Sequence, residues 1–163
     1  MNQICQEGMA RGLKHYFYGG TQETLNQLVE KLKLKFADIQ IAGTYSPGYL
    51  QVGDEESLSV IERMNQSGAD ILWVGLGSPK QDYWMAQHRF KITIPVMIGA
   101  GAAFDFLAGV KPQAPRWMQR SGLEWIFRLL TEPKRLWRRY LLGNPRFVYL
   151  ILMREIFKRP RFV

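Results

Sequence analysis

Four short apolar segments, each closed by glycine and followed by a helical pattern, constrain the fold of this 163-residue chain most strongly. The predicted strands are His15–Tyr18, Asp38–Ala42, Ile71–Val74 and Ile94–Ile98. Between them, apolar residues recur at i, i+3, i+4 and i+7, the pattern of a helix that covers a sheet. Alternation of this kind predicts an α/β fold with a parallel sheet.

Local signals indicate where the helices begin. Thr21 is a good N-cap for the first helix, because its hydroxyl can accept a bond from a first-turn N–H. The second helix is expected to run from about Asp54. For the third, we expect Ser78 as N-cap and Pro79 at the first helical position, where its missing N–H costs nothing. His15 and His88 have no partner signature and are expected to be structural.

Glycine-rich turns follow all four strands, at their carboxyl ends. The turns are Gly19-Gly20, Gly43–Tyr49, Gly75–Gln81 and Gly99–Gly101. In an open parallel sheet these ends share one edge, and ligands bind in the crevice beside it. Each following helix also directs its positive N-terminus there, which suits a nucleotide diphosphate. Neither a dinucleotide fingerprint nor a P-loop is present.

The positive charge is concentrated in the last third of the chain. Residues 1–110 carry 9 Lys and Arg against 11 Asp and Glu, whereas residues 111–163 carry 13 against 3. The second segment also holds Trp117, Trp125 and Trp137. The pattern indicates an anionic partner: nucleic acid, a lipid surface or a phosphorylated substrate. The alternative is a solvated basic surface.

Cysteine content and apolar runs exclude several classes. Cys5 is the one cysteine, which excludes an internal disulfide and a cysteine-based zinc site. The longest apolar run, Phe147–Met153, is far shorter than the ~20 residues of a membrane-spanning helix. No signal-peptide pattern is present, so a bacterial-type cytoplasm is the simplest location.

Three blocks of sequence resemble a known family. GLGSPKQDYW (Gly75–Trp84), GAGAAFDFLAG (Gly99–Gly109) and APRWMQRSGLEWIFRLLTEPKRLWRRYL (Ala114–Leu141) are similar to the signature blocks of the WecG/TagA/CpsF glycosyltransferases. The resemblance implies a Rossmann-like parallel sheet with helices on both faces, plus a basic helical C-terminal appendage. We therefore expect a sugar-nucleotide-binding core over residues 1–110 and the appendage over residues 111–163.

The resemblance also implies an activity. Members transfer N-acetylmannosamine or a related sugar from a UDP donor to an undecaprenyl-diphosphate-linked acceptor, with inversion and without a metal or other cofactor. They act in teichoic acid, common antigen, capsule or exopolysaccharide synthesis. The family's proposed catalytic aspartate lies before the strand found here at His15–Tyr18, and residues 1–14 contain no aspartate. We accordingly expect this chain to correspond to the carboxyl part of such an enzyme.

Arginines are the expected phosphate ligands. The sequence has no Asp-x-Asp pair that could hold a divalent metal, so side-chain cations must stabilise the leaving UDP. Arg128, Arg135 and Arg138 have spacings of seven and three, close to one helical face, and the resemblance gives them this role. The alternative is that they are surface arginines whose stems cover apolar residues.

Other candidates lie on the glycine turns. Asp105 either accepts hydrogen bonds from the nucleoside or caps a short helix; the resemblance favours the nucleoside. Gln81 is expected to bond the donor sugar or the diphosphate, and Lys80 either pairs with phosphate or is solvated. Tyr49 either stacks on the nucleotide or packs in its loop. Backbone contacts to the donor are expected at Gly19, Gly20, Gly77 and Gly101.

Glu124 is a possible replacement base, but Ser121-Gly122-Leu123-Glu124 fits a capping box better. The region after Lys111 is expected to form about three amphipathic helices, divided at Pro133 and Pro145, that dock on anionic lipid at the inner face of the cell membrane. The cations expected at the membrane are Arg146, Arg154, Lys158, Arg159 and Arg161.

The leading interpretation is thus a peripheral membrane glycosyltransferase without nucleic acid as a partner, and a homo-oligomer is possible. One alternative is an inactive remnant that binds UDP or anionic lipid. The other is a nucleic-acid-binding protein that uses its basic tail.

Overall fold

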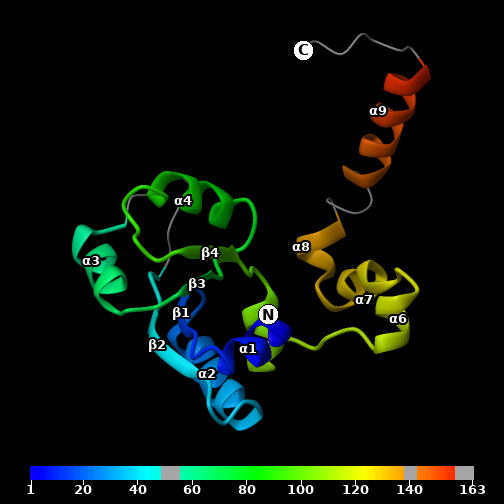
Figure 1. The fold of residues 1–163 in the computed structure, drawn as a ribbon. Coiled ribbons are helices and arrows are strands. Elements are labelled where there is room, and N and C mark those ends of the chain that lie inside the picture. The colour runs from blue at the N-terminus through cyan, green and yellow to red at the C-terminus, as the bar shows by residue number, and fades with distance from the viewer. Residues whose placement is uncertain (49–55, 138–142, 157–163) are drawn as a thin grey trace. The chain divides into compact units, whose positions relative to one another are not determined.

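The computed structural model describes residues 1–48, 56–137 and 143–156 (Figure 1). The chain divides into two compact units, Met1–Pro112 and Gln113–Val163. Among the described residues, no helix combines the length and apolar character that a membrane span requires.

A four-stranded parallel sheet forms the centre of the first unit, which confirms the predicted α/β class. Its strands are β1 (Lys14–Tyr18), β2 (Gln40–Tyr45), β3 (Ile71–Val74) and β4 (Val96–Gly99), in the order β2-β1-β3-β4. The second and fourth strands begin two residues later than expected, and β2 extends to Tyr45 instead of ending at Ala42. β1 and β3 are buried almost throughout, as the central strands of a parallel sheet are.

Helices cover both faces of this sheet (Figure 1). On one face lie α1 (Asn2–Met9), α2 (Gln22–Lys35) and α5 (Ala103–Ala108); on the other lie α3 (Leu58–Gln66) and α4 (Lys80–His88). The side chains of β1 and β3 alternate between two apolar cores, because successive residues of a strand point to opposite faces. Phe17 and Trp73 enter the first core, whereas Tyr18 and Val74 enter the second.

The helix starts confirm one expectation and correct two. Thr21 caps α2 as predicted, and its hydroxyl accepts a hydrogen bond from Thr24 N–H at 3.1 Å. α3 begins at Leu58 rather than near Asp54, because Ser57 supplies the side-chain cap. Pro79, not Ser78, is the N-cap of α4, and the Ser78–Pro79 peptide is cis. α4 begins at Lys80, so its first turn starts one residue later than the sequence indicated.

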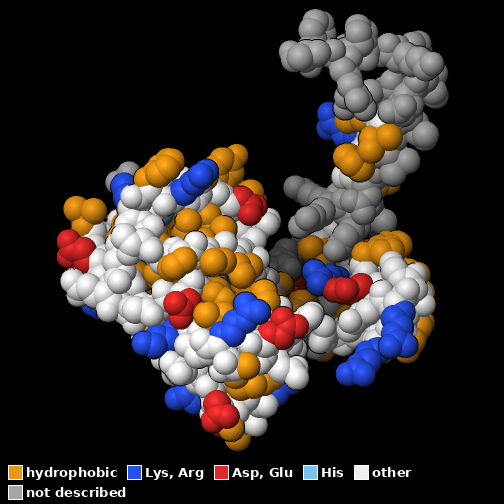
Figure 2. Space-filling view, viewed as in Figure 1, with side chains coloured by type: hydrophobic (Ala, Val, Ile, Leu, Met, Phe, Trp, Pro, Cys, Tyr) orange, Lys and Arg blue, Asp and Glu red, His pale blue; other side chains and the backbone are white. Residues whose placement is uncertain are grey.

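The second unit contains four described helices where three were expected. They are α6 (Arg116–Arg120), α7 (Glu124–Thr131), α8 (Pro133–Trp137) and α9 (Asn144–Ile156). Pro133 begins α8 and Pro145 lies in the first turn of α9, positions that tolerate proline. The additional break falls at Gly122, which takes a φ of 70° between α6 and α7. Lys and Arg side chains gather over α6, where Arg116 and Arg120 are exposed (Figure 2).

Candidate functional site

The carboxyl ends of the strands meet at one edge of the sheet, as expected. Gly19 N–H donates to Tyr45 O at 2.9 Å, which joins the turn after β1 to the end of β2. Gly75 N–H donates to Tyr18 O at 2.7 Å, which joins the turn after β3 to the end of β1. Backbone hydrogen bonds within the protein therefore hold these two glycine turns against the neighbouring strand ends.

Several glycines at this edge are required by internal packing. A Cβ on Gly19 would lie 2.8 Å from the backbone of Gly75, and a Cβ on Gly75 would overlap the Phe104 ring. A Cβ on Gly99 would lie 2.7 Å from Gln81 Nε2. The space beside these three glycines is thus occupied by other parts of the protein, which explains why a side chain is excluded there.

Gly77 differs from these packing glycines. It has a φ of 77°, and apart from its two chain neighbours no atom of the described residues lies within 4 Å of the position that a Cβ would take. A glycine with positive φ and open space beside it leaves its backbone accessible to another molecule. Of the four glycines predicted to contact the donor, Gly77 is the one with this open space, while Gly101 adjoins Gln81.

Gln81 carries an unsatisfied polar atom into this edge. It lies in the first turn of α4, and 8% of its surface is exposed. Its Nε2 donates to Ser78 Oγ at 3.4 Å, whereas its Oε1 is buried without a hydrogen-bond partner among the described residues. A buried acceptor without a partner costs free energy, about 1–3 kcal/mol. Gln81 is therefore suited to accept a hydrogen bond from a ligand donor group.

Asp105 is paired in this structure. It lies in the first turn of α5, whose N-cap is Ala102, so the alternative that Asp105 caps this helix is wrong. Its carboxylate forms an ion pair with Lys111 Nζ at 2.8 Å. Both side chains are about one-quarter to one-third exposed, so a ligand can compete with this pair at modest cost.

The two histidines are structural, as predicted. Both are fully buried. His15 Nδ1 accepts a hydrogen bond from Trp73 Nε1 at 3.1 Å, so the proton of the neutral ring is on Nε2. Burial lowers the pKa of His15 below its ordinary value, and the nearby Asp70 carboxylate offsets part of that effect. His88 is bonded on both ring nitrogens, at 2.8 Å to Trp84 O and at 3.2 Å to Glu56 N.

A buried acid at the same edge was missed by the sequence analysis. Glu56 is 9% exposed, and Tyr18 OH donates to its carboxylate. Burial, together with the Glu56 carboxylate, raises the pKa of the Tyr18 phenol, so that Tyr18 remains a donor. In the sequence, Glu56 ends the acidic run from Asp54, which looks like the exposed first turn of a helix. Nothing local to that run indicates a partner 38 residues away.

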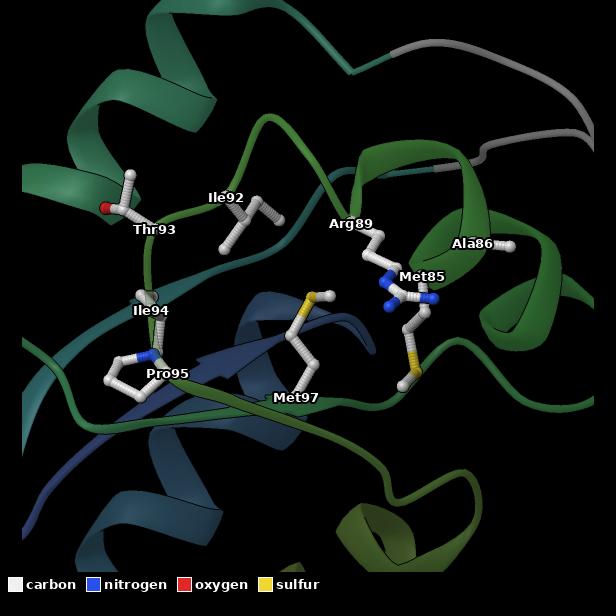
Figure 3. A pocket seen from close by; sticks show the side chains of 8 residues that line it. All are labelled: Met85, Ala86, Arg89, Ile92, Thr93, Ile94, Pro95 and Met97. Carbon is white, nitrogen blue, oxygen red and sulfur yellow. The ribbon is translucent and has the colours of Figure 1, made fainter.

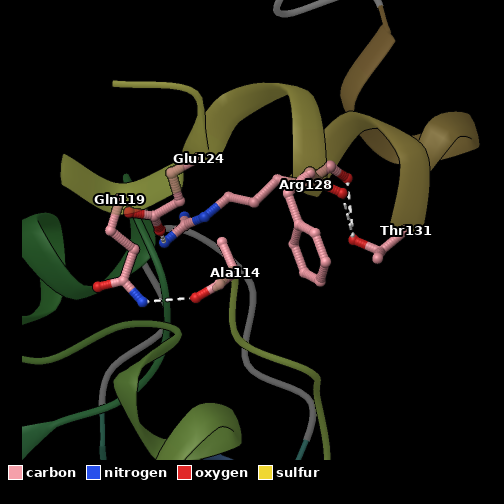
Figure 4. A network of polar contacts seen from close by, with 6 residues as sticks. Ala114, Gln119, Glu124, Arg128 and Thr131 are labelled. Atoms are coloured by element: carbon pink, nitrogen blue, oxygen red, sulfur yellow. Dashed lines mark hydrogen bonds and ion pairs between the residues drawn. The ribbon is translucent and has the colours of Figure 1, made fainter. Parts of the chain in front are cut away.

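The second unit pairs Arg128 with Glu124. Arg128 donates to Glu124 Oε1 at 2.5 Å across one turn of α7 (Figure 4). The capping-box expectation for Glu124 is wrong, because Leu123 is the N-cap of α7 and no side chain bonds there. Pairs of this spacing on an exposed helix contribute only about 0.3–0.5 kcal/mol. A phosphate can therefore displace Glu124 from Arg128.

The remaining candidates are partly outside the described residues. Tyr49, Arg138, Lys158, Arg159 and Arg161 fall in the segments that are not described, as do the side chains of Arg135 and Arg154. Arg146 is exposed on α9, and so are four large apolar side chains of that helix. These are Phe147, Tyr149, Leu150 and Ile151, with exposures between 44% and 63%.

A separate pocket of about 560 Å³ lies between α4 and β4 (Figure 3). Its walls come from the second half of α4, residues 92–95 and β4, and the Arg89 side chain extends beside Met85. None of the predicted site residues lines it.

The comparison with protein families decides where this architecture belongs. The profile of the glycosyl transferase WecG/TagA/CpsF family matches residues 1–161. The chain belongs to this family. The resemblance of the three sequence blocks is thereby confirmed.

Two curated WecG/TagA/CpsF-like relatives support the same conclusion. The chain is 35% identical over 140 residues to the N-acetylglucosaminyldiphosphoundecaprenol N-acetyl-beta-D-mannosaminyltransferase of Bacillus spizizenii. It is 33% identical over 140 residues to the protein of the same name from Bacillus subtilis. Each match covers 86% of this chain and 52% of the relative, so the chain spans about half the length of these relatives.

Within this WecG/TagA/CpsF chain, the described residues contain no cluster of three or more His, Cys, Asp or Glu side chains that could hold a metal ion. Near the glycine turns, Lys80 lies in the first turn of α4.

Proposed function

We propose that this chain forms the sugar-nucleotide-binding part of an inverting glycosyltransferase. Its donor is UDP-N-acetylmannosamine or a related UDP-sugar, and its acceptor is a sugar linked to undecaprenyl diphosphate. The names of the two Bacillus relatives support this donor sugar and this acceptor. The expected pathway is the synthesis of a cell-surface polysaccharide such as teichoic acid, at the inner face of the cell membrane.

The observation that carries the proposal is the unsatisfied amide of Gln81 at the start of α4. The N-terminus of a helix attracts phosphate, because the helix dipole favours negative charge there. Gly77 leaves open space immediately before this helix, and Gln81 Oε1 needs a donor. A UDP-sugar supplies both requirements, a diphosphate and several N–H and O–H donors.

The reaction needs a base and a stabilised leaving group. The acceptor hydroxyl loses its proton to the base and forms a bond to C1 of the sugar, while the bond from C1 to the diphosphate oxygen breaks. The negative charge then lies on UDP. We assign its stabilisation to the start of α4 with Lys80, and to Arg128, Arg135 and Arg138. No metal is invoked, because the sequence has no Asp-x-Asp pair.

UDP calorimetry with and without chelator tests this proposal. We expect UDP to bind equally in both conditions, and Gln81→Ala to weaken binding about 2- to 10-fold, the equivalent of one net hydrogen bond. Gln87→Ala, six residues later on the same helix, is the control and should bind like the unaltered chain. Binding that disappears with chelator would contradict the metal-free assignment, and equal binding by both variants would contradict the role of Gln81.

A membrane role for the second unit is proposed from α9. Its exposed apolar side chains and Arg146 form the combination expected of an interfacial helix. Each Lys or Arg near an anionic surface contributes about 1 kcal/mol, so the basic residues of this unit can hold the protein at the membrane together with α9. Arg154, Lys158, Arg159 and Arg161 are assigned to the same surface.

A further inference from the structure

Four side-chain rings form a continuous stack beside the carboxyl edge of the sheet. This edge, which carries Gly19, Gly75, Gly77 and Gln81, is called the ligand edge below. Tyr45 stacks on Tyr18 with ring centroids 6.0 Å apart, and Tyr18 stacks on Trp84 at 4.2 Å. Trp84 in turn stacks on His88 at 4.6 Å. The stack therefore links the last residues of β2 and β1 to the middle and the end of α4.

Glu56 closes this stack into a hydrogen-bonded network. One carboxylate oxygen accepts from Tyr18 OH, and the other accepts from Ser57 N–H at 3.1 Å. The backbone N–H of Glu56 donates to His88 Nε2 at 3.2 Å. Because Nε2 is an acceptor, the ring proton of neutral His88 lies on Nδ1, which donates to Trp84 O at 2.8 Å. The Tyr18 hydroxyl, the Glu56 carboxylate and both ring nitrogens of His88 are thus each matched to a specific partner, whereas Trp84 Nε1 is buried without a hydrogen-bond partner among the described residues.

Burying the Glu56 carboxylate costs desolvation free energy. Within the described part of the chain, no Lys or Arg forms an ion pair with Glu56. Apolar side chains of similar volume often stabilise a core as well as buried charged groups do. Directional hydrogen bonds such as those of Glu56, Tyr18 and His88 differ from apolar packing in that they favour one specific geometry.

The network joins the elements that carry the candidate site. Tyr18 directly precedes the Gly19-Gly20 turn, and Trp84 lies three residues after Gln81 on α4. Fixing Tyr18 to Trp84 and His88 therefore fixes the first turn of α4 relative to the end of β1.

We propose that Glu56 is a positioning residue for the ligand edge: through Tyr18 and His88 it sets where Gln81 and the start of α4 meet a nucleoside diphosphate. Glu56 does not touch the ligand. The inference rests on the proposed function for its ligand, but the position of α4 can be measured without one.

The test compares Tyr18→Phe and Glu56→Gln with a matched control. Asp70→Asn is the control, because Asp70 also accepts a backbone N–H bond, from Lys14 at 2.8 Å, but at the amino ends of the strands. The measurements are UDP affinity by calorimetry, thermal unfolding, and hydrogen exchange of the Gln81 and Tyr83 amides, which bond Gly77 O and Pro79 O.

We expect Tyr18→Phe to weaken UDP binding roughly tenfold, because small displacements of binding groups have large effects, and to speed exchange of the two α4 amides. The Glu56→Gln variant still offers Tyr18 an acceptor oxygen, so it should retain most of the UDP affinity of the unaltered chain. Asp70→Asn should change stability without changing affinity or exchange on α4.

Two outcomes would overturn the inference: unchanged exchange on α4 in Tyr18→Phe, or equal loss of affinity in Asp70→Asn at equal loss of stability. If Tyr18→Phe does not fold, Glu56→Ala replaces it in the comparison, and unchanged α4 exchange in that variant overturns the inference as well. Absence of UDP binding by the unaltered chain would overturn the proposed function, and faster α4 exchange in Tyr18→Phe would still support the positioning role.

Discussion

At the scale of single residues, buried polar atoms separate structural from functional roles. His15 and Gln81 are both buried and each leaves one polar atom without a partner among the described residues, His15 Nε2 and Gln81 Oε1. His15 lies inside the sheet, with its other nitrogen bonded to Trp73. Gln81 lies at the carboxyl edge beside the open Gly77. Position in the fold therefore indicates a structural role for His15 and supports the proposed ligand-binding role of Gln81.

His15 predicts how stability depends on pH. Its pKa is lowered in the folded state, mainly by burial, from an ordinary value of 6.5. The unfolded chain consequently binds a proton first, and stability is lost as the pH falls below about 6.5. The slope from this residue is at most about 1.4 kcal/mol per pH unit. Urea unfolding of the unaltered chain and of His15→Gln, between pH 7.5 and 5, should show a smaller dependence in the variant; equal slopes would contradict the prediction.

At the scale of elements, the apolar periodicity of the sequence explains how the helices of the first unit pack on the sheet. The apolar side chains of α9 are not buried in this way. The helices of the first unit bury one face each, but α9 exposes most of the large apolar side chains that are described on it. A helix with such a surface is suited to a lipid interface.

The lipid interface predicts a specific loss on substitution. Phe147→Ser with Leu150→Ser should reduce co-sedimentation with vesicles that contain anionic lipid, because both side chains are more than half exposed on α9. Leu34→Ser is the matched control, since Leu34 is 80% exposed on α2 in the first unit. Binding by the double variant that equals the control, or binding that ignores salt and lipid charge, would contradict a membrane role for α9.

At the scale of the whole molecule, the proposed function has two parts, donor binding and sugar transfer, and transfer also requires a general base. Of the acids near the ligand edge, Asp105 pairs with Lys111 and Glu56 is buried against Tyr18. Both carboxylates thus already have partners within the protein. Binding and turnover are therefore expected to separate in this chain.

Turnover of the 163-residue chain is predicted to be slow. Without a positioned general base, the rate should fall roughly 10²–10⁴-fold. An assay with UDP-N-acetylmannosamine and a sugar linked to undecaprenyl diphosphate, run beside UDP calorimetry, measures both properties. UDP binding with little product would fit the prediction, whereas turnover of about 1 per second or more would contradict it and show that another residue serves as base.

The amino-acid sequence by itself determined the features that depend on neighbouring residues. The strand and helix periods, the glycine after each strand and the Thr21 cap are local patterns, and they led to the parallel sheet and its ligand edge. The three sequence blocks led in the same way to the family.

Tertiary structure alone decided the features that depend on residues far apart in the chain. The bond between Tyr18 and Glu56 spans 38 residues, and the packing of Gly19 against Gly75 joins two separate turns. Two local interactions can also compete for one side chain. Glu124 bonds Arg128 instead of capping its helix. Periodicity indicates which face of an element is buried, but the partner of each buried polar atom is set only when the elements pack together.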